Sequence, residues 1–302
     1  LILSRLGFAA ITLLSVLLIV FVALRLSGNP AQLLAPEGAT PEQIADLGRQ
    51  LGFDQPYAMQ FANYLGGLLR FDLGLSVVQR LPVLDILCSR LPYSLALSGF
   101  AFFLAVMGGG ALGLIAAASH SVLSRGLVFL IVLITQSLPT FLTGLLLILL
   151  FSVHLGWQPS SGAGTPVSVL MPGLALGAYS MAIIARIVMT GLKEELAREY
   201  ARACRARGLG ELRILFCHGL RNAAPSLLAL TALEAGNLFA GTLVVETVFA
   251  WPGIGQLLLQ SVQARDYPVA QAVVLVVALI YIGANLIADL AQMLFDPHIR
   301  PA

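Results

Sequence analysis

The densest group of ionisable side chains lies in one short segment, Glu199-Tyr-Ala-Arg-Ala-Cys-Arg-Ala-Arg-Gly-Leu209. Glu194 and Arg198 are four positions apart, and the first residue of the segment is three before Arg202, so both pairs can support a helix. Gly208 then ends the pattern, as a helix-terminating glycine does. Such a segment is suited to binding a charged surface in water. That surface is either a soluble protein or a layer of lipid headgroups, and composition does not separate the two.

Three polar side chains interrupt otherwise apolar segments. Glu234 and Asn237 are one helical turn apart and face the same side of a helix. Charges inside a bilayer are costly and often mark a translocation path, where a carboxylate would select a cationic or amine-bearing substrate. The alternative is structural, with Glu234 paired with Arg186 or with a partner subunit. For Arg186, near the end of its segment, the structural interpretation is the simpler one.

Residue patterns for chemistry on a bound substrate are missing from the sequence. The four histidines, at 120, 154, 218 and 298, fall in separate segments without an HExxH spacing, so no metal site is predicted. The three cysteines form no CxxC pair. The G-x-x-x-x-G-K-[ST] phosphate loop is also absent, since the only lysine, Lys193, follows Thr190-Gly-Leu. The chain is therefore expected to be no enzyme, to hold no cofactor and to bind no ATP itself.

The composition sets the class of protein that positions these residues. Apolar residues make up 58% of the 302 residues and charged residues 11%, and the mean hydropathy is +0.91. Soluble domains average about 45–50% apolar and about 25% charged residues. The sequence therefore predicts an all-α integral membrane protein in contact with a lipid bilayer, and no nucleic-acid partner is expected.

Six segments are long and apolar enough to cross the membrane, which takes about 20 residues as a helix. No internal repeat stands out, and no span is obviously broken in matching halves. The predicted spans are 6–24, 91–119, 127–151, 167–190, 226–245 and 269–290.

Basic residues in the short loops predict the orientation, because lysine and arginine concentrate on the cytoplasmic side. The connection 190–224 is by far the most basic, with Lys193, Arg198, Arg202, Arg205, Arg207, Arg213 and Arg221. The connection 152–168 has none, and 246–268 has only Arg265. This distribution places 190–224 and both termini in the cytoplasm. The expected organisation is a first span at 1–26, an outer segment at 27–90, a five-helix core at 91–291 and a tail at 292–302.

The outer segment is expected to contain two short helices. One begins at Pro41, with Thr40 as its N-cap, and the other covers 57–71 with apolar residues near one face. These helices can either form a lid that helps to deliver substrate or simply stabilise the first two spans.

The order of residues in the basic segment, followed by His218-Gly-Leu-Arg-Asn222, resembles the cytoplasmic coupling motif of ATP-binding cassette importer permeases. The closest group is the peptide/nickel group, first-permease type. Further similar motifs are Gly52-Phe-Asp-Gln-Pro56, Asp72-Leu-Gly-Leu-Ser76, Arg90-Leu-Pro92, Glu246-Thr-Val-Phe-Ala-Trp-Pro-Gly-Ile-Gly255, Ala264-Arg-Asp-Tyr-Pro268 and Asp296-Pro-His-Ile-Arg300.

The resemblance implies a type I importer fold and one half of a translocation pore in a bacterial inner membrane. It also implies a second, homologous permease in a heterodimer, two subunits that bind ATP and Mg, and an extracytoplasmic substrate-binding protein. Peptides, glutathione, nickel and metal chelates all remain possible cargoes. The residues expected to couple the chain to the ATPase are Glu199, Tyr200, Arg202, Ala203, Arg205, Gly208 and Leu209.

Two other functions are weighed against this one. A secondary transporter or channel that works without ATP would carry ion-coupling residues in broken helices, and it would leave the segment 199–209 without a purpose. A membrane-embedded enzyme would need clustered His, Asp or Glu residues at membrane depth, and the sequence shows none.

Overall fold

The computed structural model describes residues 2–295 except 27, 29–30, 32–34, 36–37, 51, 53 and 120. His120 and the end of the predicted tail, 296–302 with its resemblance motif, lie outside the described residues. The described residues are helical apart from turns and one isolated bridge between Leu75 and Pro82. The chain divides into two compact units, Leu1–Ser94 with Pro252–Leu279 and Leu95–Trp251 with Ile280–Ala302.

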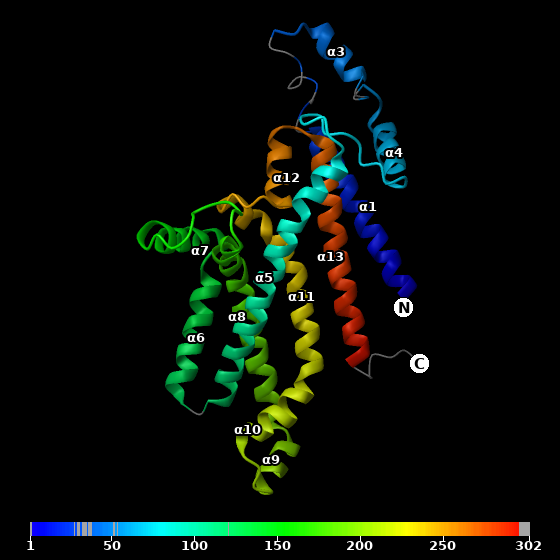
Figure 1. The fold of residues 1–302 in the computed structure, drawn as a ribbon. Coiled ribbons are helices and arrows are strands. Elements are labelled where there is room, and N and C mark those ends of the chain that lie inside the picture. Colours follow the sequence, from blue (N-terminus) through cyan, green and yellow to red (C-terminus); the bar gives the residue numbers. More distant parts are fainter. Residues whose placement is uncertain are drawn as a thin grey trace. The chain divides into compact units, whose positions relative to one another are not determined.

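The first unit contains the outer segment together with parts of the spans before and after it (Figure 1). Its described helices are α1 (Ile2–Leu26), α3 (Pro41–Gln50), α4 (Tyr57–Leu68), the start of α5 (Val83–Ala118), α12 (Ile254–Gln263) and the start of α13 (Tyr267–Phe295).

Both helices expected in the outer segment are present. The first, α3, begins with a capping box, in which the Gln43 N–H donates to Thr40 Oγ1 (3.3 Å) and the Thr40 N–H donates to Gln43 Oε1 (2.9 Å). The second, α4, packs on α1 through Phe61 and Phe21, whose ring centroids lie 5.2 Å apart.

Two of the sequence motifs meet in the first unit. The buried Asp266 carboxylate accepts a hydrogen bond from the Ser76 hydroxyl and another from the Val77 N–H (3.2 Å). A buried carboxylate is stable only when such donors compensate its desolvation. Asp266 therefore fixes the turn that leads into α5.

The second unit contains the rest of α5 and most of the remaining helices. They are α6 (Val122–Ser137), α7 (Thr140–Leu147), a π-helical turn (Ile148–His154), a 3₁₀ turn (Pro166–Val169), α8 (Leu170–Ala197), α9 (Glu199–Ala206), α10 (Glu211–Ile214), a second π-helical turn (Leu215–Gly219), α11 (Leu220–Val248) and the end of α13.

The spanning helices largely match the prediction. Four described helices are long and apolar enough to cross a membrane, and there are six if each of two bent pairs is taken as one span. The bent pairs are 122–154 and 211–248. The fourth span continues past Thr190 to Ala197, because Lys, Glu, Leu and Ala all favour a helix.

The predicted span 127–151 is bent in the structure. Its two parts, Val122–Ser137 and Thr140–His154, are inclined by 104°. The break falls at Leu138, which is extended (φ −89°, ψ 124°), and Pro139. Proline has no N–H to donate and pushes the residue before it out of the helical region.

Helix α8 lies at the centre of the second unit and packs closely on α5. Two Gly-x-x-x-Gly spacings lie in this contact, Gly109 with Gly113 on α5 and Gly173 with Gly177 on α8. A Cβ atom at Gly109 would lie 2.5 Å from the Met181 carbonyl oxygen, and one at Gly177 would lie 2.7 Å from the Ala101 carbonyl oxygen. The missing side chains let the two backbones approach.

Candidate functional site

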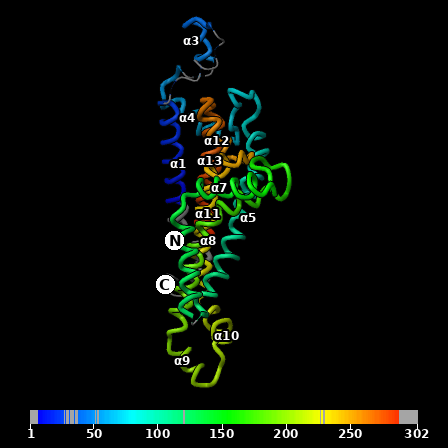
Figure 2. Tube along the Cα trace, turned by 90° about the vertical axis from the view of Figure 1, so that its left-hand side faces the viewer, coloured from blue at the N-terminus to red at the C-terminus, as the bar shows by residue number. Residues whose placement is uncertain are grey.

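The basic segment forms a helical elbow, which we define as residues 198–219. It leaves α8, turns through α9 and α10, and returns through a π-helical turn into α11. In Figures 1 and 2, α9 and α10 lie at one end of the second unit, and α7 lies at the other. The charged elbow is therefore held on the ends of two long apolar helices.

The elbow begins at a break between α8 and α9 that no glycine or proline marks. Arg198 is extended there (ψ 160°). Its guanidinium lies 2.9 Å from Oε1 of Glu195, a side chain only 10% exposed in the last turn of α8. The sequence pattern predicted Glu194 as this partner, and the structure uses the neighbouring glutamate. The ion pair fixes the point at which the chain turns.

Tyr200 also contacts the last turn of α8, at the point where the chain turns. Its hydroxyl donates to Oε2 of Glu195 at 3.1 Å. Burial raises the pKa of Tyr200; a hydrogen bond with Asn222 lowers it, and the one with Glu195 raises it. Tyr200 thus contacts α8 and is also bonded to Asn222 of α11, so it joins both arms of the elbow. Glu195 and Asn222 were not among the predicted site residues.

Gly208 ends α9 in the manner that its position predicted. Its φ of +78° is in the left-handed region. The Gly208 N–H donates to the Arg205 carbonyl (2.9 Å), and the Leu209 N–H donates to the Cys204 carbonyl (3.2 Å). These two bonds define a Schellman cap, which needs a residue free to adopt positive φ.

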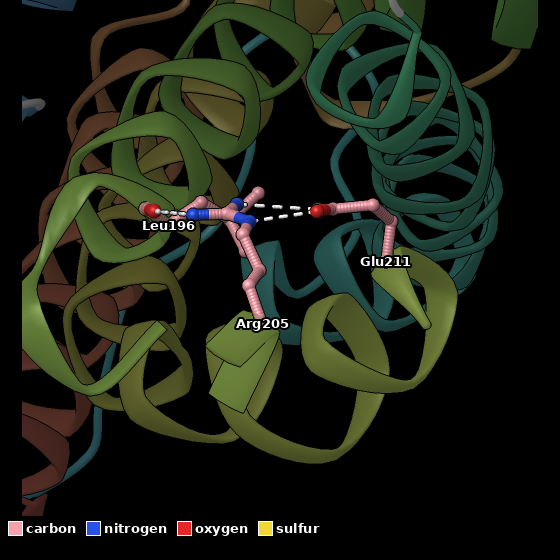
Figure 3. A network of polar contacts seen from close by, with 3 residues as sticks. All are labelled: Leu196, Arg205 and Glu211. Carbon is pink, nitrogen blue, oxygen red and sulfur yellow. Dashed lines mark hydrogen bonds and ion pairs between the residues drawn. The ribbon is translucent and has the colours of Figure 1, made fainter. Parts of the chain in front are cut away.

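Arg205 joins the helices of the elbow through hydrogen bonds to Glu211 and Leu196 (Figure 3). Its Nε and one amino group donate to the two oxygens of Glu211, at 2.6 and 3.1 Å. The other amino group donates to the Leu196 carbonyl at 3.2 Å. The hydrogen bond with Glu211 raises the pKa of Arg205. One side chain of α9 therefore holds both α8 and α10.

The predicted coupling residues divide into two sets. Glu199, Arg202, Ala203 and Gly208 are exposed, while Leu209 is half-buried. Tyr200 and Arg205 are engaged within the elbow. Within the described chain, Glu199 and Arg202 form no ion pair with each other, although their spacing would allow one. Their charges remain available to a partner.

Of the predicted path residues, Glu234 and Asn237 lie on α11 and Arg186 lies on α8. Glu234 is 8% exposed, and its carboxylate accepts hydrogen bonds from the Ser180 hydroxyl (2.9 Å) and the Asn237 amide (3.3 Å). Arg186 is exposed and donates to Oε1 of Gln136 on α6 at 3.5 Å. The structure therefore brings Glu234 and Asn237 together and does not pair Glu234 with Arg186.

Ser180 was missed because a lone serine in an apolar helix gives a weak signal. A serine hydroxyl in such a helix commonly bonds its own backbone, and only the fold shows that this one reaches α11. The bond links the centre of α8 to α11 at the level of the buried carboxylate.

Comparisons with known proteins agree with this architecture. Residues 109–301 match the family model "Binding-protein-dependent transport system inner membrane component", and residues 1–98 match the N-terminal model of the same transport system membrane component. The chain is 41% identical over 286 residues to the glutathione transport system permease protein GsiC of Escherichia coli O6:H1, which covers 95% of this chain and 93% of that protein. It is 40% identical over the same length to GsiC of Shigella dysenteriae serotype 1.

Two solved structures share the fold. The MetNI methionine ABC transporter in inward-facing conformations has a chain with a TM-score of 0.61 at 20% identity, covering 70% of this chain and 97% of that one. An amino acid ABC transporter crystallised with histidines gives a TM-score of 0.54 at 19% identity, covering 71% and 94%. The chain therefore belongs to the family of binding-protein-dependent transport system inner membrane components and is an ATP-binding cassette importer permease of the peptide/nickel group.

Proposed function

We propose that the elbow is the surface on which an ATP-hydrolysing subunit docks and through which it moves the spanning helices. The exposed Glu199, Arg202, Ala203 and Gly208 would contact that subunit. Tyr200, Arg205 and Leu209 would hold the elbow in shape.

The observation that carries this proposal is the double attachment of Arg205 to α8 and α10. A force on α9 reaches the Leu196 carbonyl directly, without passing through a flexible linker. Because α8 packs tightly on α5, a displacement of its end moves the helix as a body. The elbow is thus built to transmit motion.

The family shows which subunit does what. This chain is a transport subunit, and ATP hydrolysis belongs to partner subunits. We propose two such subunits that bind ATP and Mg, a second homologous permease that completes the pore, and an extracytoplasmic binding protein that delivers the cargo. The elbow and both termini would lie in the cytoplasm of a bacterial cell, consistent with the basic residues around the elbow.

The broken helix at Pro139 is a feature that a secondary transporter would share. Such transporters place ion-coupling groups at the break. Between Val132 and Leu147 the sequence has no aspartate, glutamate, lysine or arginine. The break therefore has no charged side chain for ion coupling, and an ATP-driven importer remains the function that the elbow supports best.

The docking surface is tested by reversing one exposed charge. We expect Glu199→Arg to reduce co-purification of the ATPase subunits and ATP-driven uptake by at least about tenfold, because a lost interfacial charge pair costs roughly 2–5 kcal/mol. Glu194→Arg is the matched control, since it makes the same change at an exposed site on α8 outside the elbow. Equal co-purification of Glu199→Arg and the unmodified chain would remove α9 as the docking surface.

For the cargo, we propose a small peptide of the glutathione or dipeptide class, supported by the 41% identity to a permease named for glutathione transport. Glu234 would bind the cargo's amino group from the path. Its carboxylate has acceptor sites beyond the two used by Ser180 and Asn237. The ligand retained by the companion binding protein identifies the cargo, and retention of nickel alone would contradict a peptide.

The role of Glu234 is tested by comparing two variants that break the same bond between α8 and α11. Glu234→Ala is expected to lower peptide uptake about tenfold, the typical effect of losing a hydrogen bond to a charged group. Ser180→Ala removes the same hydrogen bond but keeps the carboxylate, and it should leave the ratio of uptake among peptides unchanged. If both variants lower thermal stability equally and neither changes that ratio, the role of Glu234 is structural.

A further inference from the structure

A second polar site lies beside the elbow, on the side that faces the bundle. It is a cavity of about 400 Å³ formed by the end of α5, the start of α6, the end of α8 and α10. Its charged lining comes from Arg125, Lys193, Arg205 and Glu211, and Ser119 is a further polar lining residue. Its apolar lining includes Leu196 and Leu212. The lining thus combines charged and apolar side chains.

The charged lining residues have an excess of positive charge. Three cationic side chains and one carboxylate line the cavity. That carboxylate, Glu211, is bound by Arg205 through two hydrogen bonds. In the part of the chain that the structure describes, no ion pair involves Lys193. The lining therefore has a net formal charge of +2 and suits an anion.

The position of the cavity indicates which anion. Ala117 and Ala118 are the last residues of α5, and Ala197 is the last of α8. Both helices are long and apolar enough to cross a membrane. A cavity lined by their ends lies where hydrocarbon gives way to headgroups. Basic pockets between spanning helices at this level bind anionic headgroups.

We propose that this cavity binds a phosphate group, supplied by the headgroup of an anionic phospholipid. The phosphate oxygens would accept charge-assisted hydrogen bonds from Lys193 and Arg125, and the first carbons of the acyl chains would lie against Leu196 and Leu212. Because Arg205 lines both the cavity and the elbow, the bound lipid touches the same side chain that clamps α8 to α10. The proposal is independent of the cargo and of ATPase docking.

The experiment is native mass spectrometry of the purified full chain, titrated with phosphatidylglycerol or with zwitterionic phosphatidylcholine. We expect phosphatidylglycerol to bind more tightly, and Lys193→Gln and Arg125→Gln each to weaken it by about fivefold, the contribution of one basic residue near an anionic surface. Arg213→Gln is the matched control, because it removes an exposed charge from α10 that does not line the cavity. Lys193→Arg keeps the charge and should retain binding, which separates charge from folding.

Titration with inorganic phosphate shows whether the cavity takes its phosphate group only from a lipid headgroup or also as free phosphate. If millimolar phosphate displaces phosphatidylglycerol, the site also accepts free phosphate, and if it does not, the site is specific for the lipid; both results support the proposal. Equal loss of lipid in Lys193→Gln and Arg213→Gln, or no loss in any variant, overturns it. A chain that binds neither ligand, but whose Lys193→Gln variant fails to retain the ATPase subunits, would show that the cavity receives an acidic side chain of the partner, and the proposal would be wrong.

Discussion

Replacing Gly208 by proline is expected to abolish ATP-driven uptake while the chain still inserts into the membrane. The native residue has φ +78° and donates its N–H to the Arg205 carbonyl. Proline has φ near −65° and no N–H, so it can satisfy neither requirement. The Schellman cap is lost, and α10 leaves α9 in a different direction. The docking surface then no longer has the shape that the ATPase subunit binds.

A smaller change at Gly208 should cause a smaller loss of uptake. Gly208→Ala keeps the N–H but places a Cβ in the left-handed region, which costs about 1–2 kcal/mol, so uptake should fall partially. Gly210→Ala is the control, since that residue has φ −68° and nothing lies within 4 Å of the point where its Cβ would be. Uptake is measured in vesicles with the complete transporter, and insertion by protease accessibility. Uptake by Gly208→Pro at the rate of the unmodified protein would show that the elbow does not couple ATP hydrolysis to transport.

Local sequence signals predicted the elbow's cap and the position of the spans. Gly208 lies after a helical stretch and before residues that resume a helical pattern, and this is the setting in which a glycine adopts positive φ. The same holds for α3, where Thr40 and Gln43 are spaced for a capping box. In both cases all the interacting groups lie within a few residues of one another, so spacing alone is sufficient.

The features that the sequence did not predict depend on contacts between distant residues. The break at Arg198 has no glycine or proline and is fixed by the buried Glu195. The contact between Asp266 and Ser76 joins residues 190 positions apart. Ser180 reaches Glu234 only because α8 packs on α11. None of these pairings follows from residue types, because each depends on how the helices pack.

The break at Leu138 was missed for a different reason. The apolar run on both sides of it is long enough for a continuous span, and the prediction rested on that length alone. Pro92 is tolerated within α5, while the helix pair 211–248 bends by 63° between Pro225 and Leu230. Pro139 differs because the residue before it is extended. A proline in an apolar run therefore does not determine by itself whether the helix continues.

The sequence also did not show which of the predicted coupling side chains face outward from the elbow. The motif was expected to face the ATPase as a whole, but Arg205 is bound by Glu211 and Leu196 inside the elbow. A helix of eight residues presents only part of its circumference to a partner. Which part it presents was set by the attachment to α8, which the sequence did not reveal.

Adding a single methyl group at Gly109 is expected to destabilise the protein, whereas the same change at the next residue is expected to stabilise it. A Cβ at Gly109 would lie 2.5 Å from the Met181 carbonyl oxygen and 2.9 Å from the Ile184 Cβ, so α5 and α8 must separate. Overpacking of this kind costs about 1–3 kcal/mol. At Gly110 nothing lies within 4 Å of such an atom, and alanine favours a helix over glycine by roughly 0.5–1 kcal/mol.

The two variants therefore form a matched pair with opposite expected signs. Both are measured by thermal unfolding in detergent and by ATP-driven uptake. Gly109→Ala should unfold at a lower temperature and transport more slowly, because α8 leads into the elbow and, if the ATPase docks there as proposed, a shift of α8 against α5 moves the docking surface. Gly110→Ala should unfold at a higher temperature with unchanged uptake. If Gly109→Ala is as stable and as active as Gly110→Ala, close backbone contact between α5 and α8 is not what transmits motion from the elbow to the bundle.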